Sequence, residues 1–258
     1  MNAVRRPLPT AAPPAREIDY PESDGQPMAE TDTHRWNMTD TIGTLAHHLP
    51  AGPALYVGGN LMMYYVEGDP RKCVSPDVFV VHGRPLLPPR RTWKTWVEGK
   101  GPDVVIEMTS PKTAREDQAT KFALYRDLLR VREYFLFDPL DEYLTPRLQG
   151  FRLRAGKYAA IRPAAGRLPS RLLGLHLEAD GDRLRLWDPA AGRRLPTPQE
   201  RADEAEAAAR AAEAAARAAE AAAREAEEGV RREAEARAAA EAEVERLRRE
   251  IAKLRRRK

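Results

Sequence analysis

Cysteine is almost absent from this sequence, and long apolar runs do not occur in it. The 258 residues include a single cysteine, Cys73, which excludes an internal disulfide and a zinc site built from cysteines and fits a reducing compartment. Nowhere do ~18 apolar residues follow one another, and the N-terminal residues 1–16 are rich in proline, alanine and arginine without an apolar segment. We therefore expect a cytoplasmic protein that neither crosses a membrane nor is secreted.

A strong excess of one charge is missing as well. With 43 basic and 39 acidic residues the net charge is +4, which by itself does not indicate a nucleic-acid-binding protein. The charges are unevenly placed, however. Residues 200–243 hold thirteen acids and seven bases, whereas residues 244–258 hold two acids and eight bases. The end of the chain is therefore a local basic block.

Composition divides the chain into three parts. Residues 1–16 predict a disordered N-terminal arm, and residues 17–196 have the mixed composition and length of one globular domain. Residues 197–258 consist almost entirely of alanine, glutamate and arginine, which predicts a long helical or coiled-coil tail after the prolines at 196 and 198.

The globular segment combines helical and strand patterns. Residues 28–49 carry apolar residues at helical spacing. The runs at 54–58, 61–66 and 77–82 are short, apolar and separated by turn residues, so we expect consecutive antiparallel strands there. Further short strands are expected near residues 148–154, 157–161 and 183–188.

A strand, a helix and a second strand are predicted at residues 103–109, 114–130 and 132–138. A crossover of this length normally places its two strands in parallel, with the helix packed over them. The sequence therefore predicts a mixed α/β sheet flanked by helices, antiparallel early in the chain and parallel late.

The tail repeats with a period of seven residues. Each glutamate of the repeat is followed four residues later by an arginine, an order that stabilises a helix by ~0.2–0.5 kcal/mol per pair. Near the end, Val244, Leu247, Ile251 and Leu254 have the spacing of a coiled-coil seam, which predicts a homo-oligomer. A solvated single helix or a flexible spacer is an equal alternative, because the alanines upstream bury little apolar area. The repeating pairs are Glu206–Arg210, Glu213–Arg217, Glu220–Arg224 and Glu227–Arg231.

Two acids lie at complementary ends of predicted strands. Asp77 opens one strand and Glu107 lies toward the end of another, so antiparallel pairing would make the two carboxylates neighbours. Burying two like charges is costly unless a cation lies between them. Two oxygen ligands on rigid strands suit Mg²⁺, with Mn²⁺ as the other candidate, so both residues are candidate metal ligands.

A lysine on the following helix supplies a third group. Three strand residues from Glu107 to the turn, and seven helical residues back to Lys121, each span about 10 Å, which brings the lysine level with the glutamate. The same helical stripe holds Ala114, Tyr125 and Leu128, so the stem of the lysine is expected to face inward. Two acids, a hard cation and a lysine are the parts that phosphodiester hydrolysis requires.

Four motifs surround these candidate residues. They are PDVFVV at 76–81, PDVVIEMTSP at 102–111, Lys121 with Tyr125, and VREYFLFDP at 131–139. Over roughly residues 18–190 the chain resembles the Uma-two family of restriction endonucleases, a branch of the PD-(D/E)XK nuclease superfamily. The resemblance implies a restriction-endonuclease-like fold, a Mg²⁺-dependent endonuclease and nucleic acid, with DNA as the expected substrate.

The resemblance also implies roles for single residues. In that superfamily an aspartate begins a core strand and an acidic residue lies on the next, and Asp77 and Glu107 match these positions. Thr109 stands where the usual pattern has lysine, which implies that the lysine has moved onto the helix as Lys121. Glu30 matches an extra acid that some superfamily members place on the first helix.

Each of these features also has a structural interpretation. A lone strand acid more often forms a salt bridge, and Lys121 could extend past Tyr125 to solvent. The segment 83–101, with Trp93 and Trp96, could grip nucleic acid by charge and stacking or cap the core. The five histidines lack metal-ligand spacing, so surface or capping roles are expected for them.

Two functions are consistent with the sequence. The first is a Mg²⁺-dependent nuclease that hydrolyses DNA, with Asp77 and Glu107 as metal ligands, Lys121 as the cationic partner, and the basic C-terminal block and segment 83–101 attracting phosphates. The second is an inactive nuclease-type domain whose long helix oligomerises or docks a partner. The first is favoured because all three chemical positions are filled.

Overall fold

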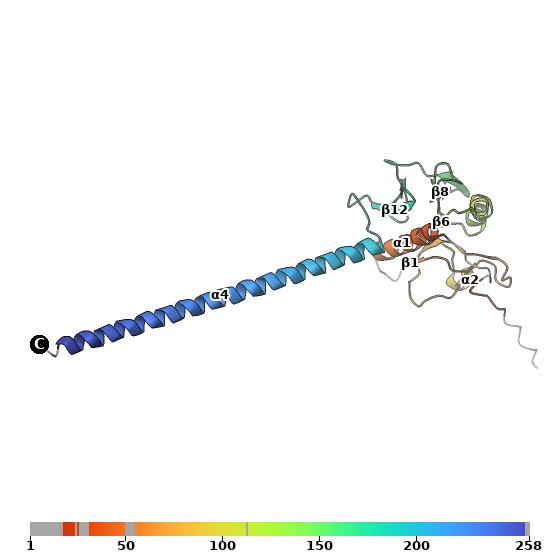
Figure 1. Cartoon of the computed structure of the whole chain (residues 1–258). Helices are drawn as coiled ribbons and strands as arrows, with labels where there is room; N and C mark the ends of the chain where they lie inside the picture. Colours follow the sequence, from red (N-terminus) through yellow and green to blue (C-terminus); the bar gives the residue numbers. More distant parts are fainter. Residues whose placement is uncertain (1–17, 24, 26–30, 50–54, 112, 256–258) are drawn as a thin grey trace, which may run out of the picture. The chain divides into compact units, whose positions relative to one another are not determined.

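The computed structural model describes residues 18–23, 25, 31–49, 55–111 and 113–255 (Figure 1). These residues belong to two compact units, Met1–Pro198 and Gln199–Lys258. The predicted arm at 1–16 and the candidate acid Glu30 lie outside the described residues.

A six-stranded mixed sheet forms the centre of the first unit. Its strands in spatial order are β1 (Leu55–Gly58), β4 (Val78–His82), β6 (Val104–Met108), β7 (Glu133–Phe137), β8 (Leu148–Arg154) and β9 (Lys157–Ala160). β6 and β7 run parallel, and every other neighbouring pair in this sheet is antiparallel. The expected crossover and the predicted mixed α/β fold are therefore confirmed.

Two smaller sheets complete the first unit. One contains β3 (Cys73–Val74), β2 (Met63–Tyr64) and β5 (Trp93–Lys94), and the other contains β10 (Leu168–Pro169), β11 (His176–Asp180), β12 (Arg183–Asp188) and β13 (Arg193–Arg194).

The prediction of three consecutive antiparallel strands was wrong in part. β1 does pair antiparallel with β4, but β2 pairs with β3 and β5 in a separate sheet. The chain leaves the central sheet at Asn60, whose φ of 50° belongs to a tight turn and whose backbone N–H donates to the carbonyl of Pro76 at 2.8 Å. This turn ends β1 before the next apolar run begins.

Both faces of β6 are buried. Val104 and Ile106 lie in one apolar cluster with residues of α1 (Asp32–His48) and of the four-stranded sheet. Val105 lies in a second cluster, together with Tyr125 of the crossover helix. Glu107 is on the same strand and is also buried, so its charge has to be compensated by neighbouring protein groups or by a bound ion.

The crossover helix is wider than an ordinary α-helix. Ala114, Lys121 and Tyr125 are buried as predicted, but Leu128, expected on the same stripe, is exposed. A π-helical turn bonds residue i to i+5, so side chains drift from the positions that a 3.6-residue repeat predicts. The helix consists of η1 (Glu116–Thr120), α3 (Lys121–Ala123) and η2 (Leu124–Leu128), where η marks the π-helical parts.

The segment 83–101 caps the core. It contains β5 and the short helix α2 (Thr95–Glu98). Trp93 is fully buried, and its indole N–H donates to the carbonyl of Lys100 at 3.0 Å. Arg90 lies over the Trp93 ring, 5.0 Å from its centroid, and pairs with Glu98 at 2.6 Å. Of the two interpretations of this segment, the structure supports the cap for Trp93 and Arg90.

The second unit is the long helix α4 (Pro198–Arg255; Figure 1), which confirms the predicted helical tail. Its residues are exposed from 202 to 253, and ion pairs such as that between Glu228 and Arg232 lie along it. Across the residues that the structure describes, no helix combines the length and apolar character needed to span a bilayer.

Candidate active site

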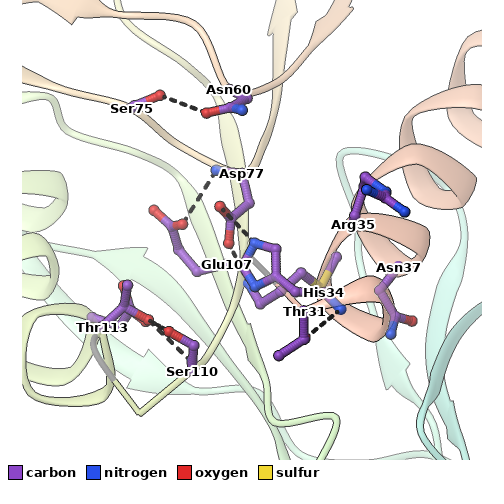
Figure 2. Close-up of polar contacts among 12 residues, drawn as sticks. Thr31, His34, Arg35, Asn37, Asn60, Ser75, Asp77, Glu107, Ser110 and Thr113 are labelled. Atoms are coloured by element: carbon purple, nitrogen blue, oxygen red, sulfur yellow. Dashed lines mark hydrogen bonds and ion pairs between the residues drawn. The ribbon is translucent and has the colours of Figure 1, made fainter. Parts of the chain in front are cut away.

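Asp77 and Glu107 lie side by side at one end of the central sheet. The antiparallel register that pairs Val78 with Ile106 brings Asp77, just before β4, next to Glu107 in β6. Backbone amides hold both carboxylates: Asp77 N–H donates to Glu107 Oε2 at 3.2 Å, and Met108 N–H donates to Asp77 Oδ2 at 2.7 Å (Figure 2). The side chain of Glu107 is fully buried, whereas that of Asp77 is 15% exposed.

Lys121 reaches this pair from the crossover helix. Its Nζ lies 3.2 Å from Glu107 Oε2 and 3.0 Å from Asp117 Oδ1. Asp117 is fully buried, and within the described chain neither of its oxygens has a partner at good hydrogen-bond geometry. The ammonium of Lys121 is therefore an ion-pair partner for two buried carboxylates at once.

Two more side chains contact the acids. His34, in the first turn of α1, places Nε2 3.3 Å from Asp77 Oδ1 (Figure 2), and Tyr125 donates its hydroxyl hydrogen to Glu107 Oε1 at 2.7 Å. Thr31 caps α1 by accepting the His34 N–H at 3.2 Å, which fixes where the helix begins. The expected surface or capping role of His34 was wrong, because α1 starts beside Asp77 and the ring is buried there.

The shared lysine leaves the carboxylates unequally charged. Burial raises the pKa of Asp77, but the contact with His34, the nearby charge of Lys121 and the Met108 N–H outweigh it and bring the pKa below its ordinary value. Burial raises the pKa of Glu107 well above its ordinary value, and the nearby Asp77 and Asp117 add to this despite Lys121. Burial likewise raises the pKa of Asp117. The site thus holds more acid groups than its resident cation neutralises.

A glycine turn positions the backbone of Asp77. A Cβ atom on Gly59 would lie 1.9 Å from the carbonyl oxygen of Asp77, so only glycine allows the two backbones to approach this closely. The next residue, Asn60, accepts a hydrogen bond from the Ser75 hydroxyl at 3.3 Å (Figure 2). Gly59 and Asn60 therefore hold the chain immediately before β4.

Other buried acids of this unit are fully partnered. Glu133 in β7 accepts from Arg152 Nε at 2.8 Å, from the Ser170 hydroxyl at 2.5 Å and from the Arg171 amide at 3.1 Å. Asp138 accepts backbone N–H groups, including that of Leu144 at 3.0 Å. These two carboxylates have structural roles, whereas Glu107 and Asp117 share one ammonium, that of Lys121, as their ion-pair partner.

The carboxylates of Asp77 and Glu107 are the side chains of this site that could bind a metal ion. The described residues contain no group of three or more His, Cys, Asp and Glu side chains placed to hold an ion. Asp77 and Glu107 nevertheless offer adjacent hard oxygen donors, and Mg²⁺ commonly takes one or two protein carboxylates and completes its shell with water and phosphate. The excess acid groups around Lys121 fit an additional cation.

The structure brings together all three residues singled out in the sequence, and their chemical roles stay predictions. Sequence reasoning missed Asp117 and His34. Asp117 has a visible signal, because it precedes Lys121 by four residues on the same helix. His34 has none, because only the packing of α1 brings it to Asp77.

A mixed sheet with paired acids at one end and a lysine on the crossover helix defines a restriction-endonuclease-like protein. The family model of Uma2, described as "Putative restriction endonuclease", matches residues 8–180, and the chain belongs to this family. A similar solved structure is described as a "putative nuclease belonging to DUF820" from Anabaena variabilis ATCC 29413. It is 16% identical with a TM-score of 0.42, over 61% of this chain and 85% of that chain. The search of curated proteins returned no match.

Proposed function

We propose that the protein is a metal-dependent endonuclease that hydrolyses phosphodiester bonds in DNA. Asp77 and Glu107 are the proposed ligands of Mg²⁺, for which Mn²⁺ can substitute, and Lys121 is the proposed cationic partner. The observation that carries this proposal is the excess of acid. Lys121 is the ion-pair partner of both Glu107 and Asp117, and Asp77 lies beside Glu107, whereas Glu133 and Asp138 accept hydrogen bonds from several donors.

When bound, the ion would supply a water of lowered pKa and neutralise charge that develops on the phosphate. The chain's own groups have separate tasks. Asp77 keeps its negative charge because of His34 and Lys121, and Tyr125 with the Asp77 amide fixes the orientation of Glu107. These contacts would hold both ligands in place before a substrate binds.

Lys121 is the group proposed to contact the substrate phosphate or the attacking water. The three surrounding carboxylates outweigh the effect of burial and raise the pKa of Lys121, so it stays protonated at neutral pH. Asp117 is proposed as a positioning residue that retains the ammonium beside Glu107. Substrate would approach from the side of Asp77, since Glu107 has no exposed surface.

Attraction of DNA is proposed to come from the basic block at 244–258. The sequence also suggested segment 83–101 for this task, but two of its five bases form ion pairs: Arg90 pairs with Glu98, and Lys100 with Asp103 at 2.7 Å. Phosphate attraction of this kind weakens steeply as salt rises, because binding releases counterions. DNA affinity is therefore expected to fall with salt concentration, as a binding titration at several salt concentrations would measure.

A cleavage assay on single-stranded, duplex and branched DNA tests the proposal. Wild type should cut at least one substrate with Mg²⁺ or Mn²⁺ and stop when the metal is chelated. Glu107→Gln should fall to the level without metal, whereas Glu133→Gln, the same change on the neighbouring strand, should keep its activity below its melting temperature. Cleavage by Glu107→Gln at the wild-type rate would refute the assignment.

The role of Lys121 has its own assay. Because an ammonium that stabilises transition-state charge contributes about 10²–10³-fold in rate, Lys121→Gln should lose activity on that scale while binding the same DNA. An unchanged cleavage rate would show that Lys121 only balances the buried charge.

A second candidate function is an assembly protein without nuclease activity. It is favoured by the apolar side chains that α4 exposes, among them Val230, Val244 and Leu247. It predicts self-association without cleavage of any DNA substrate, so the cleavage assay separates it from the first.

A further inference from the structure

The last turns of α4 expose an apolar seam. Val244, Leu247 and Ile251 are 48%, 45% and 51% exposed. Their spacing of three and four residues places them on one stripe of an α-helix, and Leu254 continues the spacing in the sequence. A narrow stripe of this kind is typically buried by a second helix that carries a matching stripe.

The residue types along the seam indicate how many helices meet. In a heptad labelled a to g, β-branched Val244 and Ile251 occupy position a, and Leu247 and Leu254 occupy position d. β-branched residues at a with leucine at d favour two parallel strands over three or four. Upstream the seam is interrupted by charged residues, Glu233 at d and Arg237 at a, so it is confined to the end of the helix.

The charges beside the seam indicate its orientation. Glu243 and Glu250 occupy g, and Arg248 and Arg255 occupy e. In a parallel pair each g residue faces the e residue five positions later on the other helix, which joins Glu243 to Arg248 and Glu250 to Arg255 of the second copy. In an antiparallel pair g faces g and e faces e, which would oppose glutamate to glutamate and arginine to arginine.

The helix leaves these charges available for a second copy. Among the residues that the structure describes, neither Arg248 nor Glu250 has an ion pair within α4, although neighbouring Arg249 pairs with Glu245 at 3.4 Å. Glu243 pairs with Arg246 at 2.7 Å, but both side chains are exposed. Because an exposed ion pair contributes little stability, Glu243 can leave Arg246 and pair with Arg248 of the second copy at little cost.

We propose that the protein is a homodimer, joined by a parallel, in-register, two-stranded coiled coil over residues 244–254. Self-complementary charge at e and g makes a second copy of this chain the matching occupant of the seam. The proposal does not depend on the nuclease function, because no residue of the candidate active site takes part.

Molar mass measured by sedimentation equilibrium on the full chain tests the stoichiometry. Wild type should give twice the 28.9 kDa chain mass at high concentration, and Leu247→Glu should give the mass of one chain. Ala252→Glu adds the same carboxylate about one turn further along but at position b, outside the seam, and should stay dimeric. A single-chain mass for wild type, a trimer or tetramer, or a dimer that survives Leu247→Glu would overturn the proposal.

Disulfide trapping tests the orientation. In a Cys73→Ser background, Ala240→Cys lies at the d position one turn before Val244. It should cross-link two chains on mild oxidation, because a parallel coil that begins at Val244 holds the two cysteines close to each other. In an antiparallel dimer centred on the seam they would be separated by about 27 Å along the helix, and no cross-link would form. Ala242→Cys, at position f, is the control and should not cross-link. Equal cross-linking of both variants, or of neither, would contradict the parallel dimer.

Discussion

Both units of this protein contain ion pairs of similar length, but the first unit buries its pair and α4 exposes its pair to solvent. Lys121 and Glu107 lie 3.2 Å apart with side chains 9% and 0% exposed, whereas Arg232 and Glu228 on α4 lie 3.1 Å apart with side chains 75% and 57% exposed. The distances are nearly equal, but only the first pair has lost its water. Burial, and not contact length, therefore decides what the loss of one partner costs.

The largest expected effect comes from removing the buried cation. Lys121→Met should lower the free energy of unfolding by about 3–5 kcal/mol at neutral pH, because it leaves Glu107 and Asp117 without a counter-charge. The matched change on the helix, Arg232→Met, should cost no more than ~0.5 kcal/mol. Urea unfolding followed by circular dichroism measures both. Equal losses would mean that burial does not distinguish the two pairs.

Replacing a glycine by alanine should also affect the two units differently: it should lower the stability of the first unit and raise that of α4. Gly59→Ala should destabilise the first unit by about 1–3 kcal/mol, since its Cβ would overlap the carbonyl oxygen of Asp77 and one of the backbones must move. Gly229→Ala should stabilise α4 by up to ~1 kcal/mol, because the new Cβ meets nothing within 4 Å and alanine favours the helix. Thermal melting of the two variants should shift in opposite directions, and a neutral Gly59→Ala would remove the proposed support of Asp77.

A smaller, pH-dependent effect is expected at the other end of β6. Burial raises the pKa of Asp103, but hydrogen bonds from Lys100 at 2.7 Å and the His82 amide at 2.8 Å outweigh it and lower the pKa. A lowered folded-state pKa stabilises the protein above the ordinary value of 3.8 and loses this contribution as pH falls through the lowered value.

Asp103→Asn should therefore cost about 1.5 kcal/mol near neutral pH, and the gap to wild type should close as the pH drops below about 4. Urea unfolding at a series of pH values measures this gap. A gap that stays constant down to strongly acidic pH would show that the carboxylate charge is not what stabilises this strand end.

The spacing of apolar and charged residues in the sequence predicted α4 and the central strands better than it predicted the residues of the site. Val104–Met108 and Glu133–Phe137 are short apolar runs joined by a segment of helical spacing, and local patterns suffice to predict a parallel crossover from them. The position of Lys121 beside Glu107 followed from counting residues along a strand and a helix, because these lengths are fixed by backbone geometry.

The features of the site that the sequence did not predict depend on long-range packing or on unusual backbone conformation. His34 meets Asp77 only because α1 is placed at the start of β4, which no local pattern encodes. The π-helical turns rotate Leu128 outward from a stripe calculated for an α-helix. Gly59 is a turn signal in the sequence, but its reason, the approach to the Asp77 carbonyl, lies 18 residues further along the chain.

Calorimetric titration with Mn²⁺ measures whether Asp77 and Glu107 together bind a cation. Wild type should bind one Mn²⁺ per chain, Asp77→Asn and Glu107→Gln should each lose this site, and Glu133→Gln should retain it. Binding of the same strength in wild type and in Glu107→Gln, or no binding in any of them, would contradict the claim.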